Sequence, residues 1–163
     1  MVRVLSYILI CFFIANVSFA ALKDDLFDDY KIYSKDVEKV INQAQKNVFK
    51  NIDDIKSLLL YNEKSTAYEK LNNINDKIFN MDAYIKAHIN VFKTKNMKDA
   101  LTYPYMELSF YEKVAGEIVA FYNAKGSITK KEIKNIEKQY KEEEKAIKKK
   151  AADIRNEFLS AVF

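Results

Sequence analysis

The chain has 163 residues, of which 49% are hydrophobic, 31% are charged and 13% are aromatic. This apolar content excludes wholesale disorder, and two glycines and one proline are too few for a turn-rich β architecture. The net charge of +4 is unevenly placed, because residues 125–163 hold 11 basic and 7 acidic side chains, whereas residues 21–124 hold 15 and 16.

The N-terminal segment has the order of features found in export signals. Arg3 supplies a short positive region, and residues 4–15 form an almost unbroken apolar run. Ser18 and Ala20 then place small residues at the −3 and −1 positions of a cut before Ala21. The sequence therefore predicts a signal peptide over residues 1–20 and a single mature domain over residues 21–163.

This segment has two other interpretations. Residues 4–22 are about as long as the ~20 residues that span a bilayer, so an uncleaved membrane anchor is the alternative to cleavage. Acylation of Cys11 does not fit, because Leu9 and Ile10 before it are not small. Cleavage removes Cys11, the only cysteine, and a mature chain without disulfides favours a bacterial periplasmic, secreted or cell-surface protein.

The first two helices are predicted over residues 24–60 and 66–94 from apolar residues that recur at steps of three or four. Four aspartates crowd the start of the first helix, where the helix dipole favours negative charge. Thr66 and Glu69 have the spacing of a capping box at the start of the second helix. The first helix is about seven residues longer than the others, so we expect it to overhang by about 10 Å or to break near Lys50 and Asn51.

The third and fourth helices are predicted over residues 97–124 and 129–161. Asn96 is a plausible N-cap for the third helix, and Gly126 suits the left-handed position after its end. Thr129 and Glu132 form a second capping box. Glu143 interrupts the apolar seam of the fourth helix, so an all-α, antiparallel up-down-up-down bundle of four long helices is favoured over a regular coiled coil.

The third helix carries a second apolar row beside the stripe expected to face the bundle. Two interpretations stay open, because a helix that is apolar on two faces is either surrounded by its neighbours or covered by a partner. Aromatic and Met side chains supply adaptable contact area, so this row is the candidate partner surface. Its members are Tyr103, Met106, Phe110, Val114 and Phe121.

The fourth helix carries a weaker candidate, a basic face made of Lys141, Lys145, Lys148 and Lys149. The spacings Glu137 to Lys141 and Glu144 to Lys148 are favourable i,i+4 pairs, which indicates a solvated face that pairs with itself. Nucleic acid is not expected as a partner of an exported chain. Contact with a lipid or an anionic envelope surface is the other interpretation.

No constellation of residues predicts catalysis, a cofactor or a metal site. His88 is the only histidine and has no evident partner for ligation or base chemistry. A di-iron bundle needs two Glu-x-x-His pairs, and a phosphate loop needs more glycines than Gly116 and Gly126. We therefore expect a protein that is not an enzyme and that carries no cofactor.

The sequence leads to one expected function and two alternatives. The expected function is an exported, non-catalytic helical bundle that binds a protein partner in the periplasm or at the cell surface. The first alternative is a periplasmic carrier or chaperone that holds an apolar ligand or an unfolded client. The second is a structural subunit of an oligomer. The identity of the partner is not predicted.

Overall fold

The computed structural model describes residue 25, residues 28–32 and residues 37–162, which form helices joined by short links with no strand among them. A short helical segment covers residues 28–32, and five longer helices follow it: α2 (Glu38–Leu60), α3 (Lys64–His88), α4 (Lys95–Lys125), α5 (Lys130–Gln139) and α6 (Lys141–Val162). The predicted all-α fold class is thus confirmed for the described residues. The predicted signal segment, its alternative as an anchor over residues 4–22 and the start of the first predicted helix lie outside them.

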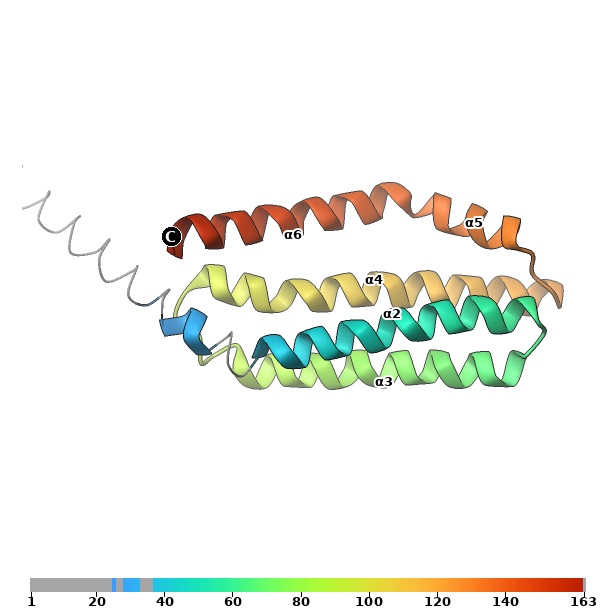
Figure 1. The fold of residues 1–163 in the computed structure, drawn as a ribbon, viewed down its shortest axis with the longest axis horizontal. Helices are drawn as coiled ribbons and strands as arrows, with labels where there is room; N and C mark the ends of the chain where they lie inside the picture. Colours follow the sequence, from blue (N-terminus) through green and yellow to red (C-terminus); the bar gives the residue numbers. More distant parts are fainter. Residues whose placement is uncertain (1–24, 26–27, 33–36, 163) are drawn as a thin grey trace, which may run out of the picture.

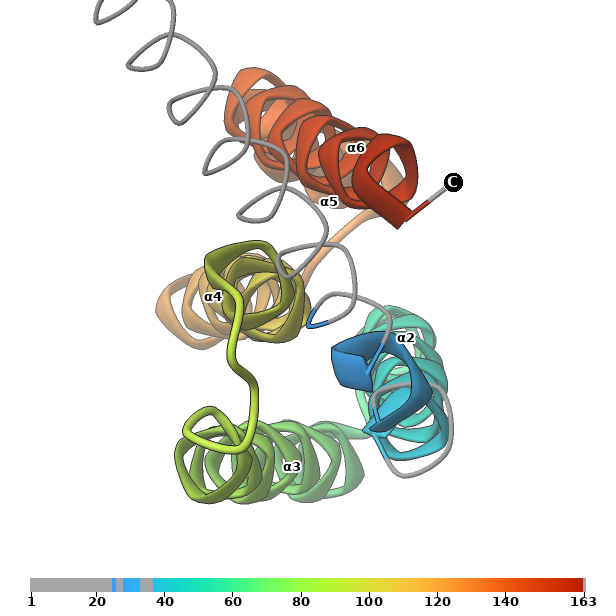
Figure 2. The ribbon, with the colours of Figure 1, turned by 90° about the vertical axis from the view of Figure 1, so that its left-hand side faces the viewer.

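The helices form two parts that share α4 (Figures 1 and 2). On one side α2, α3 and α4 pack against one another as a three-helix bundle, with short links that reverse the chain direction. On the other side α5 and α6, here called the C-terminal arm, lie along α4, and α6 does not pack along α2 or α3. The expected bundle of four helices is therefore not confirmed, because the last helix covers α4 instead of closing against the first.

The core of the three-helix part is built from the stripes that the sequence predicted for its first two helices. Each buried isoleucine or leucine contributes about 1.5–3 kcal/mol relative to an exposed one. The stripes meet the face of α4 that carries Leu101, Leu108, Ala115 and Ile118, which are fully buried. The buried residues of α2 and α3 are Ile41, Val48, Ile52, Ile55, Leu59, Ala67, Ile74, Ile78, Met81 and Ile85.

Two of the predicted helix ends are confirmed. Gly126 follows α4 with φ of 79° and donates its N–H to the carbonyl of Tyr122, as a left-handed C-cap does. Thr129 and Glu132 form the predicted capping box at the start of α5. The small number of helix-breaking residues in the sequence and the short links between the helices are consistent with these well-defined helix ends.

Two other ends differ from the prediction. Thr94, not Asn96, is the N-cap of α4, and its hydroxyl accepts a hydrogen bond from the N–H of Met97. α3 starts at Lys64, so Thr66 lies inside its first turn and does not cap it. In both cases the residue just before the predicted N-cap already belongs to the helix. At the start of α4, a buried carboxylate also binds Thr94, and this contact favours Thr94 over Asn96 as the N-cap.

The breaks in the long helices also differ from the prediction. α2 continues through Lys50 and Asn51 without interruption. The fourth predicted helix instead bends at Tyr140, which separates α5 from α6 (Figure 1). Among the described residues, no helix has both the length and the apolar character needed to cross a membrane.

The carboxylate that binds Thr94 belongs to Asp29, which is fully buried. It accepts hydrogen bonds from the N–H of Lys93 (3.0 Å), the N–H of Thr94 (2.8 Å) and the hydroxyl of Thr94 (2.7 Å). Beside it, the ammonium of Lys93 lies 2.8 Å from the carboxylate of Asp25. Asp29 therefore ties residues 28–32 to the loop before α4 and places a negative charge at the α4 N-terminus, where the helix dipole favours it.

Replacing Asp29 with alanine leaves these buried donors without an acceptor. We expect Asp29→Ala to lower the free energy of unfolding by about 2–4 kcal/mol, measured by urea denaturation followed by circular dichroism. The control is Asp28→Ala, because Asp28 is exposed, and its effect should stay below about 0.5 kcal/mol. Equal effects of the two substitutions would contradict a structural role for the Asp29 contact.

Candidate functional site

The structure divides the apolar row that the sequence proposed as a partner surface. Phe110 and Val114 are buried, with exposed fractions of 5% and 7%. The ring of Phe110 meets the ring of Tyr140 edge to face with 6.3 Å between centroids, and the hydroxyl of Tyr103 donates to the carbonyl of Ile147. The C-terminal arm packs on this part of the row, which is therefore not an exposed surface.

The remaining two members of the row stay accessible. Met106 is 39% exposed and Phe121 is 36% exposed. The ammonium of Lys125 lies 5.9 Å from the centre of the Phe121 ring. The row is therefore not one continuous surface, since the buried pair separates the two exposed side chains.

A polar seam holds the arm on α4 next to these apolar contacts. The hydroxyl of Tyr111 donates to the carboxylate of Glu144 at 2.9 Å, and the ammonium of Lys113 lies 3.0 Å from Glu143. Burial raises the pKa of Tyr103 to about 12, with nearby Glu107 adding to the effect. Burial also raises the pKa of Tyr111, so both phenols stay neutral hydrogen-bond donors at neutral pH.

Glu107 lies between this seam and α2. Its carboxylate accepts a hydrogen bond from the side-chain amide of Gln45 at 3.1 Å. Burial raises the pKa of Glu107, the nearby charge of Glu144 adds to the increase, and the bond from Gln45 opposes it. The carboxylate is thus partly desolvated between α2 and α4, and its charged form is disfavoured.

One face of α4 is left uncovered by the other described helices. We call it the open strip and define it by Met106, Ser109, Lys113, Gly116 and Ala120, which follow one another at steps of three or four. α3 borders it on one side through Leu71 and Asn75, and the arm borders it on the other through the Lys113–Glu143 pair. The open strip is therefore a shallow channel between α3 and the arm, with α4 as its floor.

A cavity of about 340 Å³ lies in this channel, lined by Leu71, Asn75, Ser109, Glu112, Lys113 and Gly116. A Cβ atom placed on Gly116 would meet no atom within 4 Å, so there is open space above it. The hydroxyl of Ser109 is buried and has no hydrogen-bond partner. Burial raises the pKa of Glu112, and Asn75, with its amide turned over, donates to that carboxylate at 3.0 Å.

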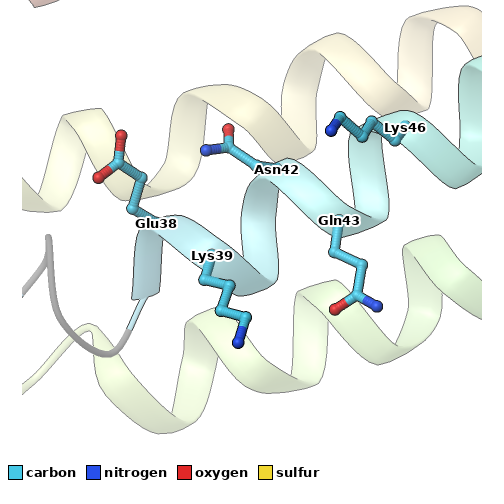
Figure 3. Close-up of a pocket in the computed structure, with 5 residues that line it drawn as sticks. All are labelled: Glu38, Lys39, Asn42, Gln43 and Lys46. Carbon is cyan, nitrogen blue, oxygen red and sulfur yellow. The ribbon is translucent and has the colours of Figure 1, made fainter.

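A second hollow lies along α2, and Figure 3 shows five residues that line it: Glu38, Lys39, Asn42, Gln43 and Lys46. Its volume is about 570 Å³. All five side chains are exposed and come from one helix, pointing to two sides of it. This geometry is that of a solvated helix surface, and it brings no reactive groups together.

The residues weighed for catalysis or metal binding do not converge. Nδ1 of His88 lies 2.8 Å from the carbonyl of Tyr84, and the two rings stack with 4.0 Å between centroids. In the described part of the chain, no three His, Cys, Asp or Glu side chains gather as a metal site would require. His88 is held by its own helix, and among the described residues no carboxylate bonds to it.

The basic face proposed on the last helix is exposed at all four of its positions: Lys141, Lys145, Lys148 and Lys149. The predicted pair between Glu144 and Lys148 is present at 2.5 Å. The pair predicted between Glu137 and Lys141 is absent, because Glu137 instead lies 2.7 Å from Lys56 of α2. A contact across helices has replaced a contact within one helix.

The open strip was not predicted from the sequence. Gly116 was noted there only because two glycines are too few for a phosphate loop. A signal for it exists in the sequence, since a glycine inside a predicted helix costs about 1 kcal/mol relative to alanine and often marks a close approach.

Comparison of the chain with family models, with curated proteins and with solved structures finds no match.

The raised pKa of Glu107 predicts a specific pH dependence. The folded state binds the proton of this group more tightly than the unfolded state, so the group costs stability at neutral pH, and this cost disappears as pH falls through the raised pKa. We expect Glu107→Gln, which keeps an acceptor for Gln45, to be more stable than the wild type at pH 7. The advantage should shrink towards pH 4.

The measurement is the difference in free energy of unfolding between the two proteins, obtained by urea denaturation across this pH range. The control is Glu117→Gln, because Glu117 is exposed on the same helix. A Glu107→Gln protein that is less stable than the wild type at pH 7, or a difference that does not change with pH, would contradict the buried position of Glu107.

Proposed function

We propose that the protein is an exported, non-catalytic helical protein that binds a protein partner through the open strip of α4. The observation that carries the proposal is the space above Gly116 in the middle of a helix that packs against α2 and α3 on one face and against the C-terminal arm on another. The proposed contact surface is the open strip and not the apolar row predicted from the sequence, because the arm already covers Phe110 and Val114.

The shape and chemistry of the strip favour a helix from the partner. Small residues let a second backbone approach closely, and Met106 beside them offers an adaptable apolar contact. The channel has helical walls on both sides, as in complexes where an amphipathic helix lies in a groove. The carboxyl group of Glu112, which lines the cavity, supplies a polar contact to orient such a helix.

The two alternatives receive less support. A carrier of an apolar ligand needs an enclosed cavity, whereas the cavity over Gly116 is open and four of its six lining residues are polar. A structural subunit would place a second copy of the chain on the same strip. In that case the protein should elute as an oligomer, and the substitutions that block the strip should return it to a monomer.

The proposal predicts that filling the space above Gly116 abolishes binding without harming the fold. Gly116→Leu places a side chain where the structure has room, and it should raise stability by about 0.5–1 kcal/mol because leucine is the better helix former. We expect this variant, used as bait in a quantitative pull-down from envelope extracts of the source cells, to lose the proteins that the wild type captures.

Two matched variants separate occupancy of the strip from other effects. Gly116→Ala gains helix stability but leaves most of the space, and Ala83→Leu adds the same side chain to an exposed position of α3. Both should capture the partner about as well as the wild type. If Gly116→Leu captures the same proteins in the same amounts, the open strip is not the binding surface.

Export is tested separately on the N-terminus of the protein purified from its own cells. Cleavage of the signal predicts a chain that begins at Ala21 and that fractionates with the periplasm, the medium or the cell surface. A chain that retains Met1 and stays with the membrane after a high-salt wash would support the anchor formed by residues 4–22. A chain that retains Met1 in the cytoplasmic fraction would reject export.

A further inference from the structure

The outer side of the C-terminal arm carries one continuous row of lysines. We call it the lysine ridge and define it by Lys131, Lys134, Lys138, Lys141, Lys145 and Lys149, which follow one another at steps of three or four across both helices. All six are exposed, whereas Ile133 and Ile136 on the opposite side are buried. At 1.5 Å per residue the ridge is about 27 Å long.

Four of the seven acidic residues of the arm contact the rest of the molecule and not the ridge. In the sequence the acidic residues alternate with the lysines and would neutralise them, but in the structure these four contact α2 or α4. Glu137 pairs with Lys56 at 2.7 Å, Glu143 pairs with Lys113 at 3.0 Å, and Glu144 accepts a hydrogen bond from Tyr111. Glu132 pairs with Lys125.

The lysines of the ridge are left largely without such partners. Within the described residues, no carboxylate lies within 4.0 Å of Lys131, Lys134, Lys138, Lys141 or Lys149. The exception on the ridge is Lys145, whose ammonium lies 2.7 Å from exposed Glu142. The packing of the arm on α4 therefore engages four of its carboxylates with α2 and α4, and it leaves five of the six ridge lysines without an ion pair among the described residues.

The chemistry of the ridge fits phosphate groups that are spread over a surface. Lysine is a flexible point charge and does not impose the fixed geometry that arginine does. The arm lies on the far side of α4 from α2 and α3 (Figure 2), and the lysines of the ridge are exposed whereas the isoleucines on the other side of α5 are buried. Residues 130–150 contain one aromatic residue, Tyr140, which packs against Phe110, so no ring is left on the ridge to stack on nucleobases.

We propose that the lysine ridge binds the surface of an anionic phospholipid bilayer, with α5 and α6 lying parallel to it. The apolar side of the arm stays packed on α4, so the contact is electrostatic and no apolar side chain of the arm inserts into the bilayer. Binding weakens as salt screens the charges, because the screening length falls from about 10 Å at 0.1 M salt to about 3 Å at 1 M. This inference is independent of the proposed partner of the open strip.

The test measures partitioning of the full chain onto vesicles of phosphatidylglycerol with phosphatidylcholine and onto vesicles of phosphatidylcholine alone. The neutral vesicles report any binding that does not depend on lipid charge, including that of the N-terminal apolar segment. We expect the anionic vesicles to bind more tightly at low salt and the difference to disappear at high salt. Equal binding to both vesicles at low salt overturns the proposal.

A charge-matched pair of variants locates the contact. Lys131→Gln/Lys134→Gln/Lys138→Gln removes three lysines of the ridge, and Lys39→Gln/Lys46→Gln/Lys50→Gln removes three exposed lysines of α2. At roughly fivefold per lysine at the surface, the ridge variant should lose roughly 100-fold of its preference for anionic vesicles. The α2 variant should retain most of it, and equal losses would show that net charge alone controls binding and overturn the proposal.

A second measurement needs no substitution and does not depend on the variants folding. Acetylation of lysines followed by mass spectrometry should show that anionic vesicles protect Lys131, Lys134 and Lys138 but not Lys39, Lys46 and Lys50. Protection of the α2 lysines instead would overturn the assignment. Protection of the ridge by polyglutamate or single-stranded RNA, with none by anionic vesicles, would identify a different class of partner and reject the membrane.

Discussion

The described structure depends on the burial of two faces of a single helix, α4. One face carries Leu101, Leu108 and Ile118, which complete the core with α2 and α3. The other face carries Phe110 and Val114, on which the C-terminal arm packs. Because α4 is the helix against which both parts pack, a change in its position would disturb the two interfaces together.

Much of the fold could be predicted from the sequence, and the reasons are local. The 3.6-residue period gave the buried stripes of α2 and α3, and residue type and spacing gave the capping box at Thr129 and the glycine C-cap at Gly126. Periodicity also revealed both apolar rows of α4. Periodicity could not predict which neighbouring helix covers each row. The same apolar stripe on the last helix is compatible with packing against the first helix, which would close a four-helix bundle, or with packing on α4.

The features that were mispredicted involve contacts between residues far apart in sequence. Thr94 and Asn96 are equally suitable N-cap types, and Thr94 is selected by Asp29, 65 residues away. Glu137 was assigned to Lys141 by the i,i+4 rule, but Lys56 of α2 is its partner. The open strip was not predicted either, because a glycine inside a helix marks the position but does not show that this side of α4 stays uncovered between α3 and the arm.

The one-sided attachment of the C-terminal arm has a consequence for how the protein forms. Residues 38–125 contain the three helices that share the main core, and the links between these helices are short, so their contacts are mostly between elements adjacent in sequence. Such topologies fold quickly, and chains that emerge from a ribosome or a translocation channel fold from their N-terminal side. The three-helix part is thus able to assemble while the arm is still being delivered. Docking of the arm on α4 then follows, and it brings Glu137, Glu143 and Glu144 into contact with α2 and α4.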